Sequence, residues 1–181
     1  PESGVRWYAG VDLGVEDDPE KAARGDSDYW AVAILRHHPR SDTTYVETIS
    51  RKRGLSLEKG VRWVKHVLSD WDVSRTLVES NQAQRWFVQT AREKGLDVDR
   101  TTSKGAKEDR IIDMAARFES GRVKLVDSPQ AAADGWESFA QEWAAFPTGA
   151  HDDRLDAVEI ALRNLSSGER SRRVGNLTDL L

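Results

Sequence analysis

Runs of apolar and β-branched residues, separated by short polar turns, dominate the first fifty positions of the chain. Three of these runs predict strands, at 6–12 (RWYAGVD), 29–37 (YWAVAILRH) and 43–50 (TTYVETIS). Residues 14–28 between the first two are polar and predict a loop. The turn between the second and third strands is too short for a crossover, so the three strands predict an antiparallel meander.

After Ser56 the spacing of apolar positions changes from that of a strand to that of a helix. Leu57, Val61, Val64 and Leu68 fall on one helical face, and Ser56 precedes them as a predicted N-cap. Strands and helices then alternate. We predict strands at 75–79, 96–101 and 122–126, and helices at 81–94, 107–120, 130–145 and 151–165.

This order of elements predicts an α/β fold. Three antiparallel strands followed by two strands that helical crossovers reach give a mixed five-stranded sheet flanked by helices, with the strand at 122–126 as an extra short one. Right-handed crossovers place the fourth strand beside the first. We expect one domain at 1–165 and a polar, basic tail or linker at 166–181.

Composition narrows the class of protein. The 181 residues fit one domain, and the absence of cysteine excludes disulfides and thiolate zinc sites. We find no apolar run long enough to cross a bilayer, and predict no membrane partner. The net charge is −4, but basic residues gather at 50–54, at 100–110 and in the tail. The only methionine is Met114, so we expect the chain to be part of a longer protein.

Acidic residues stand where the predicted elements end. Asp12 ends the first strand and Glu79 ends the fourth, so both emerge at one edge if these strands are parallel neighbours. The stretch GAHDDRLDAVEIAL opens the last helix with Asp152, Asp153 and Asp156, of which the last two share a helix face. Packing that helix across the sheet would bring its first turn to the same edge.

Converging carboxylates repel one another and raise one another's pKa values unless a cation lies among them. Oxygen ligands suit Mg²⁺ or Mn²⁺, and two such ions catalyse phosphodiester cleavage in many nucleases. Simpler explanations remain for each residue. Asp12 precedes a glycine turn, and Asp152 and Asp153 are suited to capping a helix and interacting with its dipole.

Basic residues near the predicted helix at 107–120 suggest where a phosphate group could bind. Lys104, Lys107 and Arg110 lie in and after a loop that enters this helix, although a solvated helix start would look the same. His151 either contacts phosphate, orients a metal ligand or is a surface histidine. Residues 51–53 are basic and lie at a strand end, where they could flank the same groove.

The combination of these motifs resembles the C-terminal nuclease domain of large terminase subunits of tailed-bacteriophage-type viruses, in the RNase H-like (RuvC-like) superfamily. The resemblance spans about residues 6–165. It rests on the segments YAGVDLG, DSDYWAVAIL, LVESNQ, KEDRIIDMAARFESGRVKLV and FPTGAHDDRLDAVEIAL.

The resemblance implies an endonuclease that uses two Mg²⁺ or Mn²⁺ ions to cleave double-stranded viral DNA concatemers during genome packaging. Asp12, Glu79 and Asp153 match the family's acidic triad, and Asp152 and Asp156 are additional or alternative ligands. Asp28 stands where the family often has another acid. The implied partners are DNA, an N-terminal packaging ATPase domain, the portal protein and the small terminase subunit. The implied location is the host cytoplasm, at the procapsid.

Other functions stay open on the sequence alone. A RuvC-like Holliday-junction resolvase or a transposase-type nuclease uses the same chemistry. An ATP-binding domain of the actin type also begins with D-L-G, and a binding module without catalysis would hold only a structural ion. The chain has no G-x-x-x-x-G-K-[ST] motif, so the packaging motor is not in this sequence.

Overall fold

The computed structural model describes residues 4–14, 29–79, 84–103, 105–126 and 136–178. The strands are β1 Arg6–Asp12, β2 Tyr29–His38, β3 Thr43–Arg53, β4 Val73–Glu79, β5 Val98–Thr101 and β6 Val123–Leu125. The helices are α2 Leu57–Leu68, α3 Gln84–Glu93, α4 Lys107–Glu119, α6 Trp136–Ala145 and α7 Asp153–Thr178.

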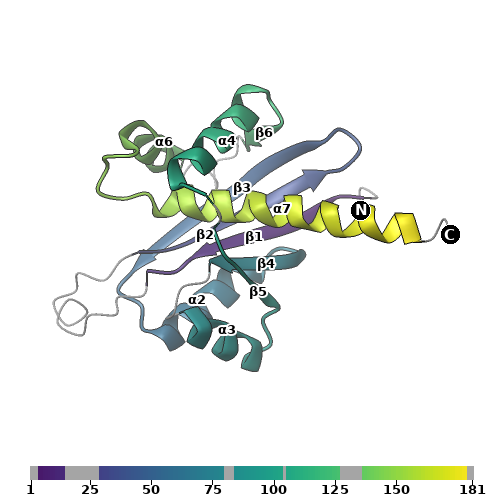
Figure 1. Cartoon of the computed structure of the whole chain (residues 1–181). Helices are drawn as coiled ribbons and strands as arrows, with labels where there is room; N and C mark the ends of the chain where they lie inside the picture. The colour runs from purple at the N-terminus through teal and green to yellow at the C-terminus, as the bar shows by residue number, and fades with distance from the viewer. Residues whose placement is uncertain (1–3, 15–28, 80–83, 104, 127–135, 179–181) are drawn as a thin grey trace.

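The strands form a single mixed sheet in the order β5-β4-β1-β2-β3-β6 (Figure 1). The predicted antiparallel meander of β1, β2 and β3 is confirmed, and β4 lies parallel to β1 as the crossover rule requires. The extra short strand, β6, pairs in parallel with β3 and makes the sheet six-stranded.

The register of the sheet brings the two strand-end acids together. Val11 of β1 pairs with Val78 of β4, and the next residue on each parallel strand is Asp12 and Glu79. On the other side, Asp12 pairs with Ala31 of β2, which in turn pairs with Arg51 of β3. Arg51 therefore lies in the same row of the sheet as Asp12, two strands away.

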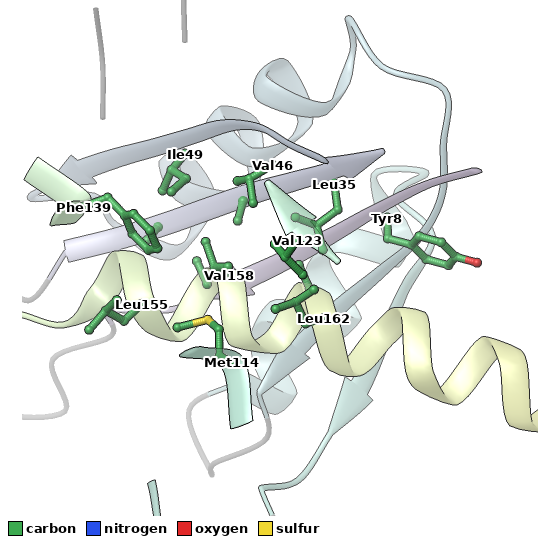
Figure 2. Close-up of a cluster of buried hydrophobic side chains, with 14 of the residues drawn as sticks. Tyr8, Leu35, Val46, Ile49, Met114, Val123, Phe139, Leu155, Val158 and Leu162 are labelled. Atoms are coloured by element: carbon green, nitrogen blue, oxygen red, sulfur yellow. The ribbon is translucent and has the colours of Figure 1, made fainter. Parts of the chain in front are cut away.

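Alternating residues of β1 and β2 serve two separate cores. Even-numbered residues of β2 such as Trp30 and Val32 pack with α2 and α3 on one face. Odd-numbered ones such as Ala33 and Leu35 pack with α4, α6 and α7 on the other. Figure 2 shows this second core, in which Met114 of α4 and Leu155, Val158 and Leu162 of α7 point at the strands. Because both faces are covered, the central strands are apolar throughout.

Helix α7 crosses the sheet directly over β1 (Figure 1), and Gly10 permits the contact. A Cβ atom at Gly10 would lie 2.3 Å from both the carbonyl oxygen of Ala157 and the backbone nitrogen of Ala161. One turn further along, the buried side-chain amide of Asn164 donates to the carbonyl oxygens of Ala9 and Arg75, at 3.1 and 2.8 Å. These contacts fix the position of α7 against β1 and β4.

The structure corrects the predicted end of the last helix. We predicted that it ends at residue 165, but α7 begins at Asp153 and continues to Thr178. Residues 166–178 contain no proline, so no position interrupts the backbone hydrogen bonds of the helix. The division into a domain at 1–165 and a tail at 166–181 stays a prediction.

Three predicted segments lie partly or wholly outside the described residues. These are the loop at 14–28, the start of the helix at 81–94 and the start of the helix at 130–145. In the part of the chain that is described, none of the helices has both the length and the apolar character required to cross a membrane.

The contact at Gly10 leads to a prediction about stability. Gly10→Ala should lower the free energy of unfolding by about 3 kcal/mol, because the new methyl group meets backbone atoms that have no rotamer to change. Gly95→Ala is the control. Gly95 has a φ of +77° but open space around it, so it should lose only about 1 kcal/mol from backbone strain. Chemical denaturation measures both losses, and equal losses would contradict the packing argument.

Candidate metal centre

Four carboxylates lie around the edge of the sheet where β1 and β4 end and α7 begins. Asp12 and Glu79 lie side by side at the sheet edge, and α7 brings Asp153 and Asp156 to them in its first turn. Burial raises the pKa of Asp12 well above its ordinary value, and the negative charges of Asp156, Asp153 and Glu79 raise it further. The charges of these four residues therefore influence one another, while their assignment as metal ligands stays a prediction.

One stripe of α7 carries four charged side chains of the site. Asp153, Asp156, Glu159 and Arg163 follow one another at spacings of three or four residues, which keeps them on one face. Burial raises the pKa of Asp156 to about 6, although a hydrogen bond from Lys107 acts in the opposite direction. Burial also raises the pKa values of Asp153 and Glu159.

Lys107, the first residue of α4, points into the acidic cluster. Its Nζ atom lies 2.6 Å from Oδ2 of Asp152 and 2.6 Å from Oδ2 of Asp156. Burial alone would lower the pKa of Lys107, but the hydrogen bonds to these two aspartates raise it more. The sequence suggested Lys107 as a DNA contact. In this structure its ammonium group instead neutralises aspartates, so the DNA contact stays a prediction.

Arg51 of β3 holds Asp153, the first residue of α7. Its Nη1 atom donates to Oδ2 of Asp153 at 3.3 Å and to Oε1 of Glu142 at 2.9 Å. The guanidinium also lies over the ring of Tyr29, 3.8 Å from the ring centroid. His151 meets the edge of the same ring, and its Nδ1 atom is 3.9 Å from Oδ2 of Asp153.

Glu142 of α6 anchors the start of α7 through contacts with Arg154. It is buried, and its carboxylate accepts hydrogen bonds from the backbone N–H and the guanidinium of Arg154, at 2.9 and 2.6 Å. With the bond from Arg51, this carboxylate has three charged or backbone donors. Two guanidinium groups on one buried carboxylate tie α6, β3 and α7 together at the site.

Glu79 has its own basic partner. Nη2 of Arg163 lies 3.4 Å from Oε2 of Glu79, and Nε of Arg163 lies 2.8 Å from Oε1 of Glu159. Arg110, which the sequence suggested as a DNA contact, lies 3.5 Å from the other oxygen of Glu159. It also donates to the carbonyl oxygen of Gly105 at 3.2 Å. Arg110 therefore faces the acidic stripe in this structure, and its role in DNA binding stays a prediction.

The residues present have the chemistry of a site for hard divalent cations. All candidate ligands are carboxylates, and burial raises the pKa values of Asp12, Asp153 and Asp156, so that a cation among them would favour their ionised forms. No three His, Asp or Glu side chains among the described residues already stand close enough to form a metal-binding group. In this structure Lys107, Arg51 and Arg163 instead supply positive charge around the carboxylates.

Two predicted residues, Asp28 and Lys104, lie outside the described residues. The sequence did not point to Glu142, Arg154, Glu159 or Arg163 as residues of the site. It suggested that residues 51–53 could flank the groove, which stays a prediction, and in this structure Arg51 lies beside Asp153. Glu142 has a detectable signal, since it stands three residues after Phe139 on the buried face of α6. Glu159 and Arg163 continue the spacing of Asp153 and Asp156. Nothing local in the sequence connects Arg51 with residues about 100 positions away.

Comparison with solved structures shows several similar folds. The nuclease domain of the P22 large terminase is 14% identical, with a TM-score of 0.66 over 91% of this chain and 84% of that one. The large terminase nuclease of thermophilic phage G20c is 16% identical in a structure with bound zinc, with a TM-score of 0.62 over 87% and 80%. The HK97 large terminase is 12% identical, with a TM-score of 0.58 over 89% of this chain and 40% of that one.

Sequence comparison agrees with the fold. No match was found among curated protein sequences. The family model of the terminase RNase H-like domain matches residues 10–165, a range that begins inside β1 and ends within α7. This range contains every candidate ligand of the acidic cluster. The chain belongs to the family of terminase RNase H-like domains.

Proposed function

We propose that this domain is a metal-dependent endonuclease that cuts double-stranded viral DNA concatemers during genome packaging. The observation that carries the proposal is the placement of Asp12, Glu79, Asp153 and Asp156 around one sheet edge, where the other three charges act on Asp12, in a fold of the terminase family. Family membership supports the nuclease role and its place in packaging. The position of the acids supports a catalytic rather than a purely structural role for this edge.

Similar structures support the use of divalent metal. The G20c nuclease has been solved with zinc, cobalt and magnesium bound, and the nuclease domain of the SPP1 large terminase with manganese bound. We propose Mg²⁺ or Mn²⁺ for this chain, with two ions at the cluster. Asp12 would contact both ions, Glu79 would hold one and Asp153 the other. Asp152 and Asp156 are additional or alternative ligands.

When bound, the ions supply Lewis acidity and neutralise the charge that develops on the scissile phosphate. The protein's own contribution is position and charge. Asp12 and Glu79 are fixed by the pairing of β1 with β4, and Arg51 holds the Asp153 carboxylate by one oxygen. His151 is exposed beside Asp153, where a phosphate group of DNA can reach it.

We further propose that the domain acts within a larger assembly. The match takes up 40% of the HK97 large terminase chain, which supports a longer subunit with an N-terminal packaging ATPase domain. Portal protein and small terminase subunit would be the other partners, at the procapsid in the host cytoplasm. A net charge of −4 favours weak DNA binding by this domain alone, so its partners would hold the DNA in place.

Supercoiled-plasmid cleavage tests the activity. We expect nicking and linearisation with Mn²⁺ and with Mg²⁺, and a loss of about a hundredfold or more in Asp12→Asn and Glu79→Gln, because each removes a charge that holds the metal. Asp97→Asn is the matched control, since Asp97 is exposed and precedes β5, at the opposite sheet edge. Loss of activity in the control, or full activity in Asp12→Asn, would refute the assignment.

The raised pKa of Asp12 leads to a prediction about pH. Since the folded protein binds this proton more tightly than the unfolded chain, the stability due to the protonated carboxyl is lost as pH rises from about 4. Without metal, Asp12→Asn should therefore be more stable than wild type at pH 7. This advantage should shrink towards pH 4.

Denaturation in EDTA at several pH values measures this difference, with Asp97→Asn as the control. Adding Mn²⁺ at pH 7 should reverse the order by stabilising wild type more than Asp12→Asn. A wild type at least as stable as Asp12→Asn in EDTA at pH 7 would show that Asp12 is not under electrostatic strain.

A further inference from the structure

Lys107 occupies a position among the acids that a DNA-binding lysine does not need. Its Nζ atom contacts Asp152 and Asp156 at equal distances of 2.6 Å, and it bridges two carboxylates that lie one helical turn apart. Asp156 is the more buried partner, with 16% of its side chain exposed, against 39% for Asp152. Charge-assisted hydrogen bonds of this length are among the stronger polar interactions in proteins.

The other acids of the cluster obtain positive charge from different residues. Arg51 of β3 lies beside Asp153, and Arg163 of α7 lies beside Glu79. Lys107 is thus the cation that α4 contributes to the Asp152–Asp156 end of the cluster. Its charge also extends to Asp12, whose carboxyl it favours in the ionised form.

A divalent ion and this ammonium group cannot bind the same oxygen together at low cost. Mg²⁺ binds carboxylate oxygens at about 2.1 Å. With Nζ 2.6 Å from Oδ2 of Asp156, both cations would lie within a few ångström of each other, where Coulomb repulsion is large. The lysine can yield more easily than an arginine, because its flexible stem lets the charge move to solvent and 32% of its side chain is already exposed.

We propose that Lys107 is a resident counter-ion of the metal centre, which occupies Asp156 in the metal-free protein and is displaced when a divalent ion binds there. The inference rests on the proposed function, since it assumes that the acidic cluster binds metal. It makes Lys107 a residue that tunes metal affinity, in addition to any contact with DNA.

Manganese titration of the whole 181-residue chain tests the proposal. Lys107→Met removes the competing charge and keeps the length of the side chain, so we expect Mn²⁺ to bind roughly tenfold more tightly than to wild type. Lys107→Arg keeps the charge and should not show this gain. Lys59→Met is the control, since Lys59 is exposed on α2, on the opposite face of the sheet.

The result separates the two proposals. Measurable Mn²⁺ binding by wild type with unchanged or weaker binding by Lys107→Met would overturn the competition and leave the metal centre standing. No binding by either protein would overturn both.

A second measurement does not depend on whether Lys107→Met folds without the positive charge of the lysine. In metal-free wild type, with EDTA present, the ammonium protons of Lys107 should exchange slowly with water, because the group is ion-paired. Its ¹⁵N–¹H signal should therefore be observable. Lys107→Arg, in which this signal is missing, assigns it. Saturating Mg²⁺ should shift the signal to that of a free lysine, and a signal that does not change would overturn the proposal.

Discussion

The site depends on how closely α7 approaches β1. At Gly10 the helix backbone lies against the strand backbone with no side chain between them, and Ala157 and Ala161 are the helix residues at the contact. A larger residue at any of the three would lift the helix from the sheet. Because Asp12 lies two residues beyond Gly10 on the same face of β1, this distance also decides whether the acids of α7 reach it. Core packing and the geometry of the site are thus set by one contact.

That approach has an electrostatic cost, which the protein offsets with basic residues from three elements. Lys107 comes from α4, Arg51 from β3 and Arg163 from α7 itself. Each lies beside a different candidate ligand: Lys107 beside Asp156, Arg51 beside Asp153 and Arg163 beside Glu79. Their positive charges offset part of the negative charge of the cluster. Burial raises the pKa of Asp12 well above its ordinary value, and the charges of Asp156, Asp153 and Glu79 raise it further. A cation placed beside this buried carboxylate would favour its ionised form.

The sequence was sufficient for the parts of this arrangement that follow from periodicity and from topological rules. Alternation placed β1, β2 and β3, helical spacing placed α2 and α7, and right-handed crossovers placed Glu79 beside Asp12. The sequence was insufficient where a side chain contacts an element that is distant along the chain. Lys107 and Arg110 were interpreted as phosphate-binding residues because the sequence shows their charges but not the carboxylates that they contact in the fold. The buried carboxylate of Glu142 and its bonds to Arg51 and Arg154 depend on three elements meeting, which no local pattern encodes.

The aspartates at the start of α7 had a simple alternative explanation, since acidic residues often cap helices. The structure argues against capping as their main task. The backbone N–H of Arg154, the second residue of the helix, donates to Glu142 of α6 at 2.9 Å. A group from another helix therefore does what an N-cap side chain at Asp152 would do. Asp152 contacts Lys107 instead, and Asp153 contacts Arg51. The helix dipole still favours acids in this turn, but their contacts point towards the sheet edge, where Asp12 and Glu79 lie.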